Sequence, residues 1–413
     1  MEIRSGLLGR KLSHSYSPEI HGMLGDYEYR LYETEEQDVG DFLRKGDFTG
    51  INVTVPYKKT VLPYMTAVSD TVKMTGSVNT IIRTADGGLY GENTDVYGFI
   101  RAFVNTGTDA AGKKALVLGS GGASASVCAA LKKLGAVPVV ISRSGGDNYG
   151  NVSKHFDADV IVNTTPVGMY PGNGETPLGL RGFEHLEAVF DLIYNPARTE
   201  LLMEAESLGI RSVNGLHMLV AQAVKSSEMF TGREIPDGVT EAVVSAIAKK
   251  TGNMILVGMP GCGKTAAGKE LAGLTGRKFI DVDREIALRY GKKPSEIILS
   301  EGEERFRSIE TGVLCEIGKS SGAIIATGGG TVTREENYRL LRQNGVVIWL
   351  KRDLNRLSQK GRPLSLSRGV EALYEERLPM YERFADVSVD SADTLSETAK
   401  RVLAAYDTFP VTN

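Results

Sequence analysis

A lysine and an aspartate near the N-terminus form a pair that could do acid–base chemistry. Lys58 ends the segment Asn52-Val-Thr-Val-Pro-Tyr-Lys58, and Asp95 ends the segment Glu92-Asn-Thr-Asp95. An ammonium group beside a carboxylate can donate a proton to an oxygen on which negative charge develops. Asp95 would equally suit a structural role as the cap of a helix. The spacing alone leaves both interpretations open.

Hydroxyl and amide side chains gather in the same part of the chain. They occur in Ser13-His-Ser-Tyr-Ser-Pro18 and in Ser77-Val-Asn-Thr80, each at an expected strand end or helix start. Side chains at such positions can converge on one ligand. Their number suits a small acid that carries several hydroxyl groups, although helix capping is again the alternative.

A third segment fits phosphate chemistry. Gly258-Met-Pro-Gly-Cys-Gly-Lys264-Thr265 matches Gly-x-x-x-x-Gly-Lys-Ser/Thr and follows an expected strand at Met254–Val257. In such a loop backbone amides surround the phosphates, Lys264 reaches the transferred group and Thr265 binds Mg²⁺. Cys262 is interpreted as a small residue that the loop permits. The residues predicted to bind ATP here are Gly261, Cys262, Gly263, Lys264, Thr265 and Ala266.

A second glycine-rich loop suits a dinucleotide. Gly119-Ser-Gly-Gly-Ala-Ser124 follows the expected strand Ala115–Leu118 and nearly fits Gly-x-Gly-x-x-Gly, with a helix expected to begin near Ala123. The next strand ends in Ser142-Arg143-Ser144 and not in an acidic residue. An arginine suits the 2′-phosphate of NADP, so NADP(H) is favoured over NAD. A structural turn and a solvated surface arginine are the alternatives.

Parallel sheets must position these loops. Short apolar runs alternate with helical patterns along the chain, which predicts α/β folds. The expected strands are Ala115–Leu118, Val137–Ser142, Val160–Asn163, Val189–Asp191, Met254–Val257, Phe279–Val282, Ile324–Ala326 and Val346–Leu350. Because each glycine loop opens its own sheet, the chain should divide near Gly232–Gly252.

We therefore predict an α/β protein of several parts. Residues 1–105 form a substrate lobe, closed by a helix near 220–250, and residues 106–235 form a Rossmann NADP-binding domain. Residues 236–252 are a linker or closing helix. Residues 253–413 form a P-loop domain with a parallel sheet like that of the nucleoside monophosphate kinases.

Composition excludes several classes of protein. The 413 residues carry a net charge of −3, without the basic excess that binds nucleic acid. Cys128, Cys262 and Cys315 have no metal-ligand spacing, and so few cysteines argue against a disulfide framework. No run approaches the ~18 apolar residues of a membrane span, and the N-terminus lacks an apolar signal core. We expect a cytoplasmic monomer or homodimer without nucleic-acid or membrane partners.

Taken together, residues 1–250 strongly resemble shikimate dehydrogenase. The resemblance rests on residues 9–21, 52–58, 76–80, 92–95, 163–169 and 214–219. It implies NADPH-dependent reduction of 3-dehydroshikimate to shikimate, with Lys58 and Asp95 as the catalytic pair. It also implies two sets of binding residues: Ser15, Ser17, Thr54, Asn79, Asn93, Tyr194 and Gln222 for the substrate, and Gly119, Gly121, Gly122, Ser142, Arg143, Ser144, Met169 and Gly215 for NADP(H).

The chain departs from this family at a few positions. Lys11 stands where the family usually has proline, and Gly22 stands in place of an asparagine. Ser124 and Thr164 replace small residues. The catalytic pair is unchanged, so these departures bear on loop geometry and cofactor affinity.

Residues 253–413 resemble shikimate kinase. The resemblance rests on the phosphate loop, Asp281-Val-Asp283, Phe306–Glu310, Ala326–Gly330, Arg362-Pro-Leu and Glu376–Tyr381. It implies phosphorylation of shikimate by ATP, with Lys264 and Asp283 as catalytic residues, and Asp283 orienting or deprotonating the attacking hydroxyl. It further implies that Asp283, Arg307, Gly329, Gly330 and Arg377 bind shikimate, that Thr265 and, through water, Asp281 support Mg²⁺, and that Arg362 closes over ATP.

The two resemblances describe consecutive reactions, because the first makes the hydroxyl that the second phosphorylates. They imply a bifunctional enzyme of aromatic amino-acid (chorismate) biosynthesis. A non-catalytic sensor of shikimate or quinate built from the same folds is the alternative from another class, and a dehydrogenase half that prefers quinate or NAD is the nearer one.

Overall fold

Three β-sheets organise the computed structural model, which describes residues 3–12, 15–358 and 369–410. The chain divides into two compact units. The first comprises Met1–Gly168, Gly174–Tyr194 and Glu204–Ile247, and the second comprises Met169–Asn173, Asn195–Met203 and Ala248–Asn413. The first unit holds two sheets and the second unit holds one.

The N-terminal sheet of the first unit is mixed, in the order β2-β1-β3-β5-β6-β4. Strand β1 is parallel to β2 and β3, whereas β5 runs antiparallel to β3 and β6. Its strands are β1 (Arg4–Gly9), β2 (Glu28–Glu33), β3 (Gly50–Val53), β4 (Ala67–Val68), β5 (Thr80–Arg83) and β6 (Leu89–Glu92). The helices of this lobe are α1 (Ser17–Leu24), α2 (Val39–Lys45) and α3 (Asp70–Thr75), with the 3₁₀ turns η1 (Glu36–Asp38) and η2 (Leu62–Tyr64).

The second sheet is fully parallel, in the order β11-β10-β9-β7-β8. Its strands are β7 (Lys114–Leu118), β8 (Val137–Ile141), β9 (Val160–Asn163), β10 (Ala188–Asp191) and β11 (Arg211–Val213). Its helices are α4 (Thr94–Asn105), α5 (Gly122–Lys133), α6 (Glu200–Ser207) and α7 (Leu216–Thr231), with η3 (Val152–His155). The four strands expected in this region are confirmed to within one residue at each end.

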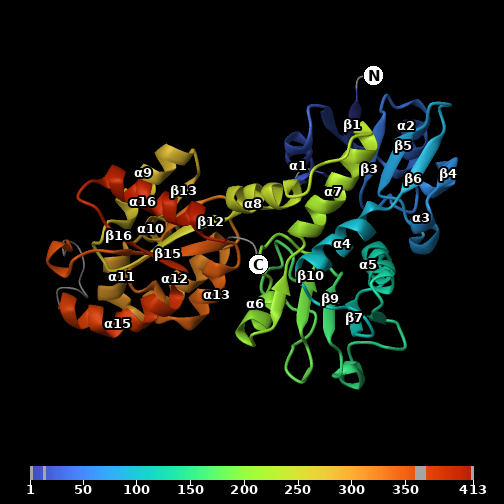
Figure 1. Cartoon of the computed structure of the whole chain (residues 1–413). Coiled ribbons are helices and arrows are strands. Elements are labelled where there is room, and N and C mark those ends of the chain that lie inside the picture. The colour runs from blue at the N-terminus through green and yellow to red at the C-terminus, as the bar shows by residue number, and fades with distance from the viewer. Residues whose placement is uncertain (1–2, 13–14, 359–368, 411–413) are drawn as a thin grey trace. The chain divides into compact units, whose positions relative to one another are not determined.

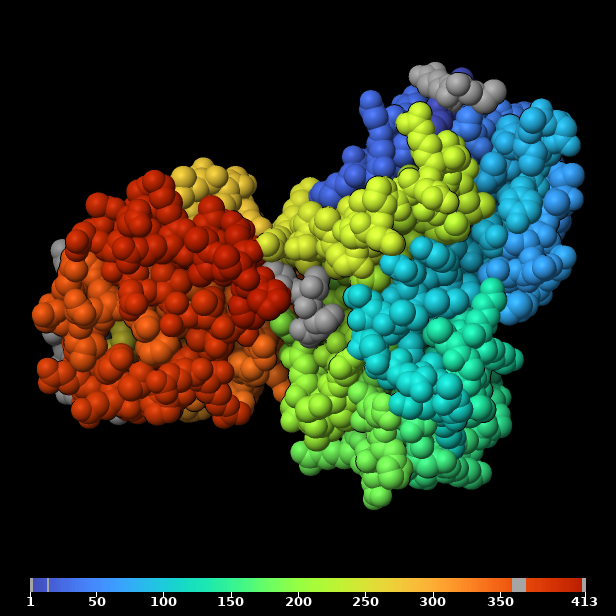
Figure 2. Space-filling model, viewed as in Figure 1, coloured from blue at the N-terminus to red at the C-terminus, as the bar shows by residue number. Residues whose placement is uncertain are grey.

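Helices α4 and α7 run between the two sheets of the first unit (Figure 1). Their close packing depends on Gly98 of α4, because a Cβ atom there would lie 2.6 Å from the carbonyl oxygen of Met218 in α7. Helix α7 also packs against α1 and β3, which are far from it in sequence. Figure 2 shows the same neighbourhood on the surface, with the yellow-green residues of α7 beside the blue N-terminal residues. Residues from the beginning and from the end of the first unit's sequence therefore pack together.

The second unit contains a parallel sheet in the order β13-β14-β12-β15-β16. The strands are β12 (Asn253–Val257), β13 (Phe279–Asp281), β14 (Ile324–Ala326), β15 (Gly345–Lys351) and β16 (Val387–Asp390). The helices are α9 (Lys264–Thr275), α10 (Val282–Tyr290), α11 (Pro294–Glu301), α12 (Glu303–Ile317), α13 (Glu335–Arg342), α15 (Val370–Phe384) and α16 (Leu395–Thr408), with η4 (Thr331–Thr333) and η5 (Leu354–Arg356).

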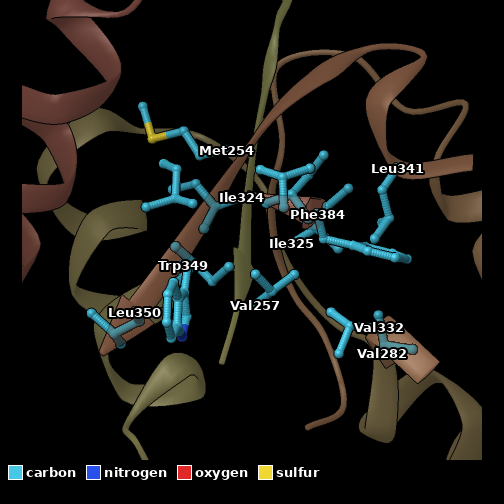
Figure 3. Packing of buried hydrophobic residues seen from close by; sticks show 14 of the residues in the cluster. Met254, Val257, Val282, Ile324, Ile325, Val332, Leu341, Trp349, Leu350 and Phe384 are labelled. Carbon is cyan, nitrogen blue, oxygen red and sulfur yellow. The ribbon is translucent and has the colours of Figure 1, made fainter. Parts of the chain in front are cut away.

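The core of the second unit forms around its central strands. Met254, Ile324 and Trp349 come from neighbouring strands and belong, with Phe384 of α15, to one cluster of buried residues (Figure 3). Such near-continuous apolar runs are typical of strands that are buried on both faces. The four strands expected in this part of the sequence are confirmed, although β13 ends at Asp281 and not at Val282.

Residues Val239–Thr251 form a single helix, α8. The sequence interpretation of this segment as a linker or closing helix therefore holds for its secondary structure, whereas the predicted domain boundaries stay predictions. Among the described residues, no helix is long and apolar enough to cross a membrane.

Candidate functional site

The lysine and the aspartate singled out in the sequence lie in contact. The Nζ atom of Lys58 donates to Oδ2 of Asp95 over 2.6 Å. The Nδ2 atom of Asn79 donates to the other carboxylate oxygen, Oδ1, over 2.8 Å. Because both carboxylate oxygens have partners, Asp95 is fixed and in turn holds the Lys58 ammonium group in place. The alternative of a mere helix cap is wrong for Asp95, since the cap of α4 is Asn93.

Asn79 is itself oriented by the start of helix α4. Its Oδ1 atom accepts the backbone N–H of Thr94 over 2.7 Å, which leaves its Nδ2 atom facing Asp95. The residue before β5 and the start of α4 therefore fix the direction of the Asp95 carboxylate together.

These groups line a cavity of about 520 Å³ in the first unit. Most of the predicted substrate-binding residues meet there. The predicted residues in its lining are Ser15, Ser17, Thr54, Lys58, Asn79, Asp95, Tyr194, Gly215 and Gln222. Ala123 of α5 also lines the cavity, so it extends to the glycine loop of the second sheet.

Asn93 does not line this cavity, in contrast to its predicted role. Its Oδ1 atom accepts the N–H of Asp95 over 3.2 Å as the cap of α4. Its Nδ2 atom donates to the carbonyl of Ser77 over 3.1 Å and to the hydroxyl of Ser126 over 3.2 Å. Because both the oxygen and the nitrogen of its amide group bond to other protein groups, Asn93 supports the residues of the site and does not itself line the cavity.

Asn52 and Lys11 line the cavity, although the sequence interpretation did not select them. Asn52 accepts the Tyr29 hydroxyl at 2.8 Å and donates to Ser226 of α7 over 2.8 Å. The alternation of side chains along an extended segment places Asn52 and Thr54 on one face, and this signal could have found Asn52. For Lys11 the available signal was its departure from the family pattern.

Tyr194 contributes an aromatic wall with a hydroxyl group. Its ring centroid lies 5.2 Å from that of Tyr16. Burial raises the pKa of the Tyr194 hydroxyl above its ordinary value, so it stays protonated and can donate a hydrogen bond at neutral pH.

The glycine loop after β7 has the conformation that a phosphate ligand requires. Gly119 adopts a φ of +107°, and a Cβ atom there would approach Thr164 Oγ1 to 2.9 Å. Helix α5 begins at Gly122, one residue earlier than expected, and no side chain caps it. Its first N–H groups thus have no side-chain partner, and the N-terminus of the helix suits a pyrophosphate.

The loop after the neighbouring strand β8 carries Ser142, Arg143 and Ser144, and the last two are exposed. Because β7 and β8 are parallel, their carboxyl ends lie at the same edge of the sheet. The exposed guanidinium group of Arg143 suits a 2′-phosphate. Met169 is 47% exposed, and its contact with a cofactor stays a prediction.

Gly215 precedes α7 where two backbone segments meet. A Cβ atom there would lie only 2.0 Å from the carbonyl oxygen of Leu192. The residue must be glycine for α7 to approach the end of β10 this closely.

In the second unit, the phosphate loop joins β12 to α9. Gly261 and Gly263 adopt φ values of +87° and +106°. Lys264 is buried, and its Nζ atom donates to the carbonyl of Gly258 over 2.7 Å. Thr265 Oγ1 donates to Asp281 Oδ2 over 2.7 Å. These contacts bring the predicted phosphate-binding and magnesium-supporting side chains together.

Asp283 lies beside other acidic groups. Desolvation by the surrounding protein, together with the charges of Glu310 and Asp281, raises the pKa of its carboxyl group to about 6. Asp283 lines the cavity and its side chain remains exposed to solvent. The pKa is therefore raised by the protein packed around the cavity, and not by complete burial of the side chain. A carboxylate with a pKa near 6 is suited to accept a proton at neutral pH.

The two predicted carboxylate-binding arginines are buried. Arg307 donates to Glu310 Oε2 over 2.6 Å, and a Cβ atom at Gly330 would touch its guanidinium group at 2.0 Å. Arg377 is 1% exposed and donates to the carbonyl of Gly329 over 3.3 Å. Its Nε and Nη2 atoms have no hydrogen-bond partner among the described residues, which fits an anion site.

These side chains converge on a cavity of about 340 Å³. The predicted residues in its lining are Gly261, Gly263, Lys264, Thr265, Ala266, Asp283, Arg307, Gly329, Gly330 and Arg377. Cys262 and Asp281 are not in this lining. Cys262 lies buried under the loop, and Asp281 reaches the site through Thr265. The predicted Arg362 lies outside the described residues.

A smaller cavity of about 100 Å³ adjoins the phosphate loop at Cys262 and Gly263. Arg352, after β15, and Ser391, after β16, also line it. The sequence interpretation missed these residues because they meet only when two parallel strands end side by side. Among the described residues, no cluster of three or more His, Cys, Asp or Glu side chains could hold a metal ion alone.

Comparison with known proteins assigns a family to each part of the chain. The model of the shikimate kinase family matches residues 260–407. The model of the shikimate dehydrogenase substrate binding domain matches residues 7–81.

Individual relatives cover the first part of the chain. The shikimate dehydrogenase (NADP(+)) of Oleidesulfovibrio alaskensis is 36% identical over 264 residues, or 58% of this chain and 94% of that relative. The structure of shikimate 5-dehydrogenase from Thermus thermophilus in complex with NADP(H) and shikimate has a TM-score of 0.55 at 30% identity, covering 59% of this chain and 99% of that one. Quinate dehydrogenase from Corynebacterium glutamicum in complex with NAD has a TM-score of 0.55 at 28% identity, covering 60% and 98%.

Proposed function

We propose that this chain, which belongs to the shikimate dehydrogenase family and carries a shikimate kinase domain at its C-terminus, catalyses two consecutive reactions. The first unit reduces 3-dehydroshikimate to shikimate with NADPH. The second unit transfers the γ-phosphoryl group of ATP to shikimate and forms shikimate 3-phosphate. Both reactions lead toward chorismate and the aromatic amino acids.

The residues that fit NADPH are the glycine loop at Gly119–Gly122 and the exposed Arg143. The uncapped start of α5 suits the pyrophosphate, and Arg143 suits the 2′-phosphate. When bound, NADPH supplies a hydride to the carbonyl carbon of the substrate. Ser142, Ser144 and Gly215 complete the proposed binding surface.

Lys58 and Asp95 handle the charge and the proton in this reduction. Negative charge develops on the carbonyl oxygen, and the Lys58 ammonium stabilises it and donates the proton. Asp95 holds the lysine, as its contact of 2.6 Å supports. Neutral polar side chains of the cavity lining then orient the substrate: Ser15, Ser17, Thr54, Asn79, Tyr194 and Gln222.

In the second unit, Asp283 orients the attacking hydroxyl group and accepts its proton. Arg307 and Arg377 hold the carboxylate of shikimate. The Nε and Nη2 atoms of buried Arg377 have no hydrogen-bond partner among the described residues, although Nη2 lies 4.0 Å from Glu303 Oε1, and this supports the role. Lys264 neutralises charge on the transferred group, so catalysis rests on positioning and charge stabilisation. Mg²⁺, when bound with ATP, offsets phosphate charge beside Thr265 and Asp281. The small cavity at Arg352 and Ser391 suits the base of the nucleotide.

One observation carries this proposal. A single chain contains both the cavity with the Lys58–Asp95 pair and the cavity with the phosphate loop and Asp283. The product of the first reaction is the acceptor of the second. Lys58, Asp95, Lys264 and Asp283 are present among the described residues, whereas a non-catalytic sensor would not need them.

The test uses purified full-length protein with 3-dehydroshikimate, NADPH and Mg·ATP. Loss of NADPH and formation of ADP are followed separately, and we expect ADP to form only after NADPH is oxidised. NADH and quinate serve as the comparison cofactor and substrate, and we expect both to react more slowly. Oxidation of NADPH without ADP would reject the kinase assignment, and the absence of both signals would favour the sensor.

We also propose that the enzyme acts in the cytoplasm as a monomer or homodimer. The described cysteines Cys128, Cys262 and Cys315 are free, which suits a reducing compartment. Sedimentation of the purified protein at several concentrations measures the oligomeric state, and a species larger than a dimer would contradict the proposal.

A further inference from the structure

Lys11 gives the dehydrogenase cavity a positive charge that the catalytic pair does not use. The charged side chains in the cavity lining are Lys11, Lys58 and Asp95. Lys58 and Asp95 form an ion pair, so their charges offset each other. The Lys11 side chain has no hydrogen bond or ion pair with any other described residue. The described lining therefore has a net charge of about +1 at neutral pH.

The residues on both sides of Lys11 are anchored, and the two neighbouring cations Arg10 and Lys11 have different surroundings. The N–H of Leu12 donates to Glu33 Oε1 over 2.7 Å, and the Leu12 side chain is 3% exposed. Arg10 forms an ion pair with Glu35 over 3.1 Å and is not in the cavity lining. Lys11 lies between these two anchored residues and lines the cavity, so its position there follows from its neighbours.

Two hydroxyl side chains line the same cavity as Lys11. Ser15 and Ser17 lie a few residues beyond Lys11 and line the same cavity. The backbone N–H of Ser15 donates to the carbonyl of Leu12 over 3.0 Å, so Ser15 lies close to the residue that follows Lys11. An ammonium group beside two hydroxyl groups is a set of donors that suits a carboxylate.

We propose that Lys11 determines specificity in the dehydrogenase half by binding the carboxylate of 3-dehydroshikimate and shikimate. This inference rests on the proposed function of the first unit. The substrate brings one negative charge into a cavity with one unpaired positive charge. Lys11 acts on binding and on the discrimination against uncharged analogues, and not on hydride or proton transfer, which belong to Lys58 and Asp95.

The test compares Lys11→Met with the wild type in the oxidation of shikimate by NADP⁺. The methyl ester of shikimate serves as an uncharged substrate of nearly the same shape. Because Lys11 is exposed, we expect loss of the ion pair to raise the KM for shikimate about five-fold at low salt, with kcat nearly unchanged. The KM for the ester should not change, and added salt should shrink the difference between variant and wild type.

Two further variants sharpen the result. Lys11→Arg keeps the charge and should restore the wild-type KM for shikimate. Arg10→Met removes the neighbouring cation, which is paired with Glu35 outside the cavity, and should leave the KM unchanged. The kcat for the methyl ester in each variant reports whether the first unit has folded.

The inference is overturned if Lys11→Met leaves the KM for shikimate unchanged, or if the KM for the ester rises equally. A higher KM for NADP⁺ alone would assign Lys11 to the cofactor and would also overturn it. A wild-type protein that does not oxidise shikimate at all would instead reject the proposed function of the first unit.

Discussion

Two aspartates in this chain have opposite electrostatic surroundings, and their roles differ accordingly. Asp95 is paired with Lys58 and receives a hydrogen bond from Asn79, so its negative charge is well compensated. Asp283 lies near Glu310 and Asp281, and its pKa is raised to about 6. The first carboxylate holds the Lys58 ammonium group in place. The second is built to take up a proton.

Substitution of Lys58 by methionine should depress turnover in the dehydrogenase half. General acid catalysis contributes typically about 10²–10⁴-fold, so we expect kcat for NADPH oxidation to fall by a factor in that range. The KM for 3-dehydroshikimate should change much less, because the other cavity groups remain. Steady-state kinetics measure both parameters. Lys59→Met removes the adjacent exposed lysine and should have no effect; near-normal turnover of Lys58→Met would reject its assigned role.

The kinase half should lose activity in acid as Asp283 becomes protonated. The carboxylate is the form that accepts the proton of the attacking hydroxyl, and its pKa is about 6. We expect kcat/KM for shikimate to be constant above this pH and to fall as the pH decreases through it. The profile of Asp283→Asn should lack this inflection and should lie about 10²–10⁴-fold lower. A wild-type profile that falls only near pH 4 would contradict the raised pKa.

The same raised pKa predicts that Asp283 destabilises the second unit at neutral pH. Its folded pKa of about 6 exceeds the ordinary value of 3.8, so the folded state holds the proton more tightly. The resulting stability is fully present below about pH 4 and is lost as the pH rises through about 6. Asp283→Asn should therefore unfold at a higher temperature than the wild type at pH 8, and the difference should vanish near pH 4. A lower unfolding temperature for the variant at pH 8 would exclude this interpretation.

The elements were predictable from sequence where strands are buried on both faces. Val160–Asn163 and Ile324–Ala326 match the expected strands residue for residue, because continuous apolar runs mark central parallel strands. Strand β2 was not predicted, since most of its residues are exposed at a sheet edge.

The candidate sites were predictable where a local motif fixes the geometry, as in the phosphate loop at Lys264. Asn93 was assigned to the substrate through the resemblance to shikimate dehydrogenase, whereas in the structure its side chain caps α4. The contacts of Asn52 and the cavity at Arg352 depend on elements that are distant in sequence. Such convergence is a property of the fold and leaves no pattern in a single segment.

The packing of α4 against α7 should be intolerant of a side chain at Gly98. A Cβ atom there would lie 2.6 Å from Met218 O and 3.0 Å from Gln222 Cβ. Helix α4 carries Asp95 and α7 carries Gln222, so separation of the helices would open the cavity. We expect Gly98→Ala to reduce dehydrogenase activity and to lower the free energy of unfolding of the first unit by about 1–3 kcal/mol. Thermal unfolding monitored by circular dichroism, with dehydrogenase assays, measures both effects.

Gly22→Ala is the matched control for this substitution. Gly22 lies in helix α1, and a Cβ atom there would meet no atom within 4 Å. Alanine should stabilise α1 by up to about 1 kcal/mol through its helix propensity. Kinase activity should be unchanged in both variants, and equal losses of stability in the two variants would contradict a packing role specific to Gly98.

On the scale of the whole molecule, each of the two cavities is lined by residues of one unit only. The dehydrogenase cavity draws on residues 7–222, and the kinase cavity draws on residues 260–377. The single tryptophan, Trp349, is buried in the core of the second unit beside Tyr381. Its fluorescence therefore reports unfolding of the second unit, while circular dichroism reports both units.

Because no residue is common to the two cavities, the two reactions should be separable by single substitutions. Lys58→Met should slow NADPH oxidation by about 10²–10⁴-fold and leave phosphorylation of added shikimate intact. Lys264→Met should do the reverse, because it removes the cation that neutralises the transferred phosphoryl group. Neither variant alone should form ADP from 3-dehydroshikimate and NADPH at the wild-type rate. An equimolar mixture should form it after a lag, since shikimate released by one protein can bind to the other. Loss of dehydrogenase activity in Lys264→Met, measured by NADPH oxidation, would show instead that the two sites depend on each other.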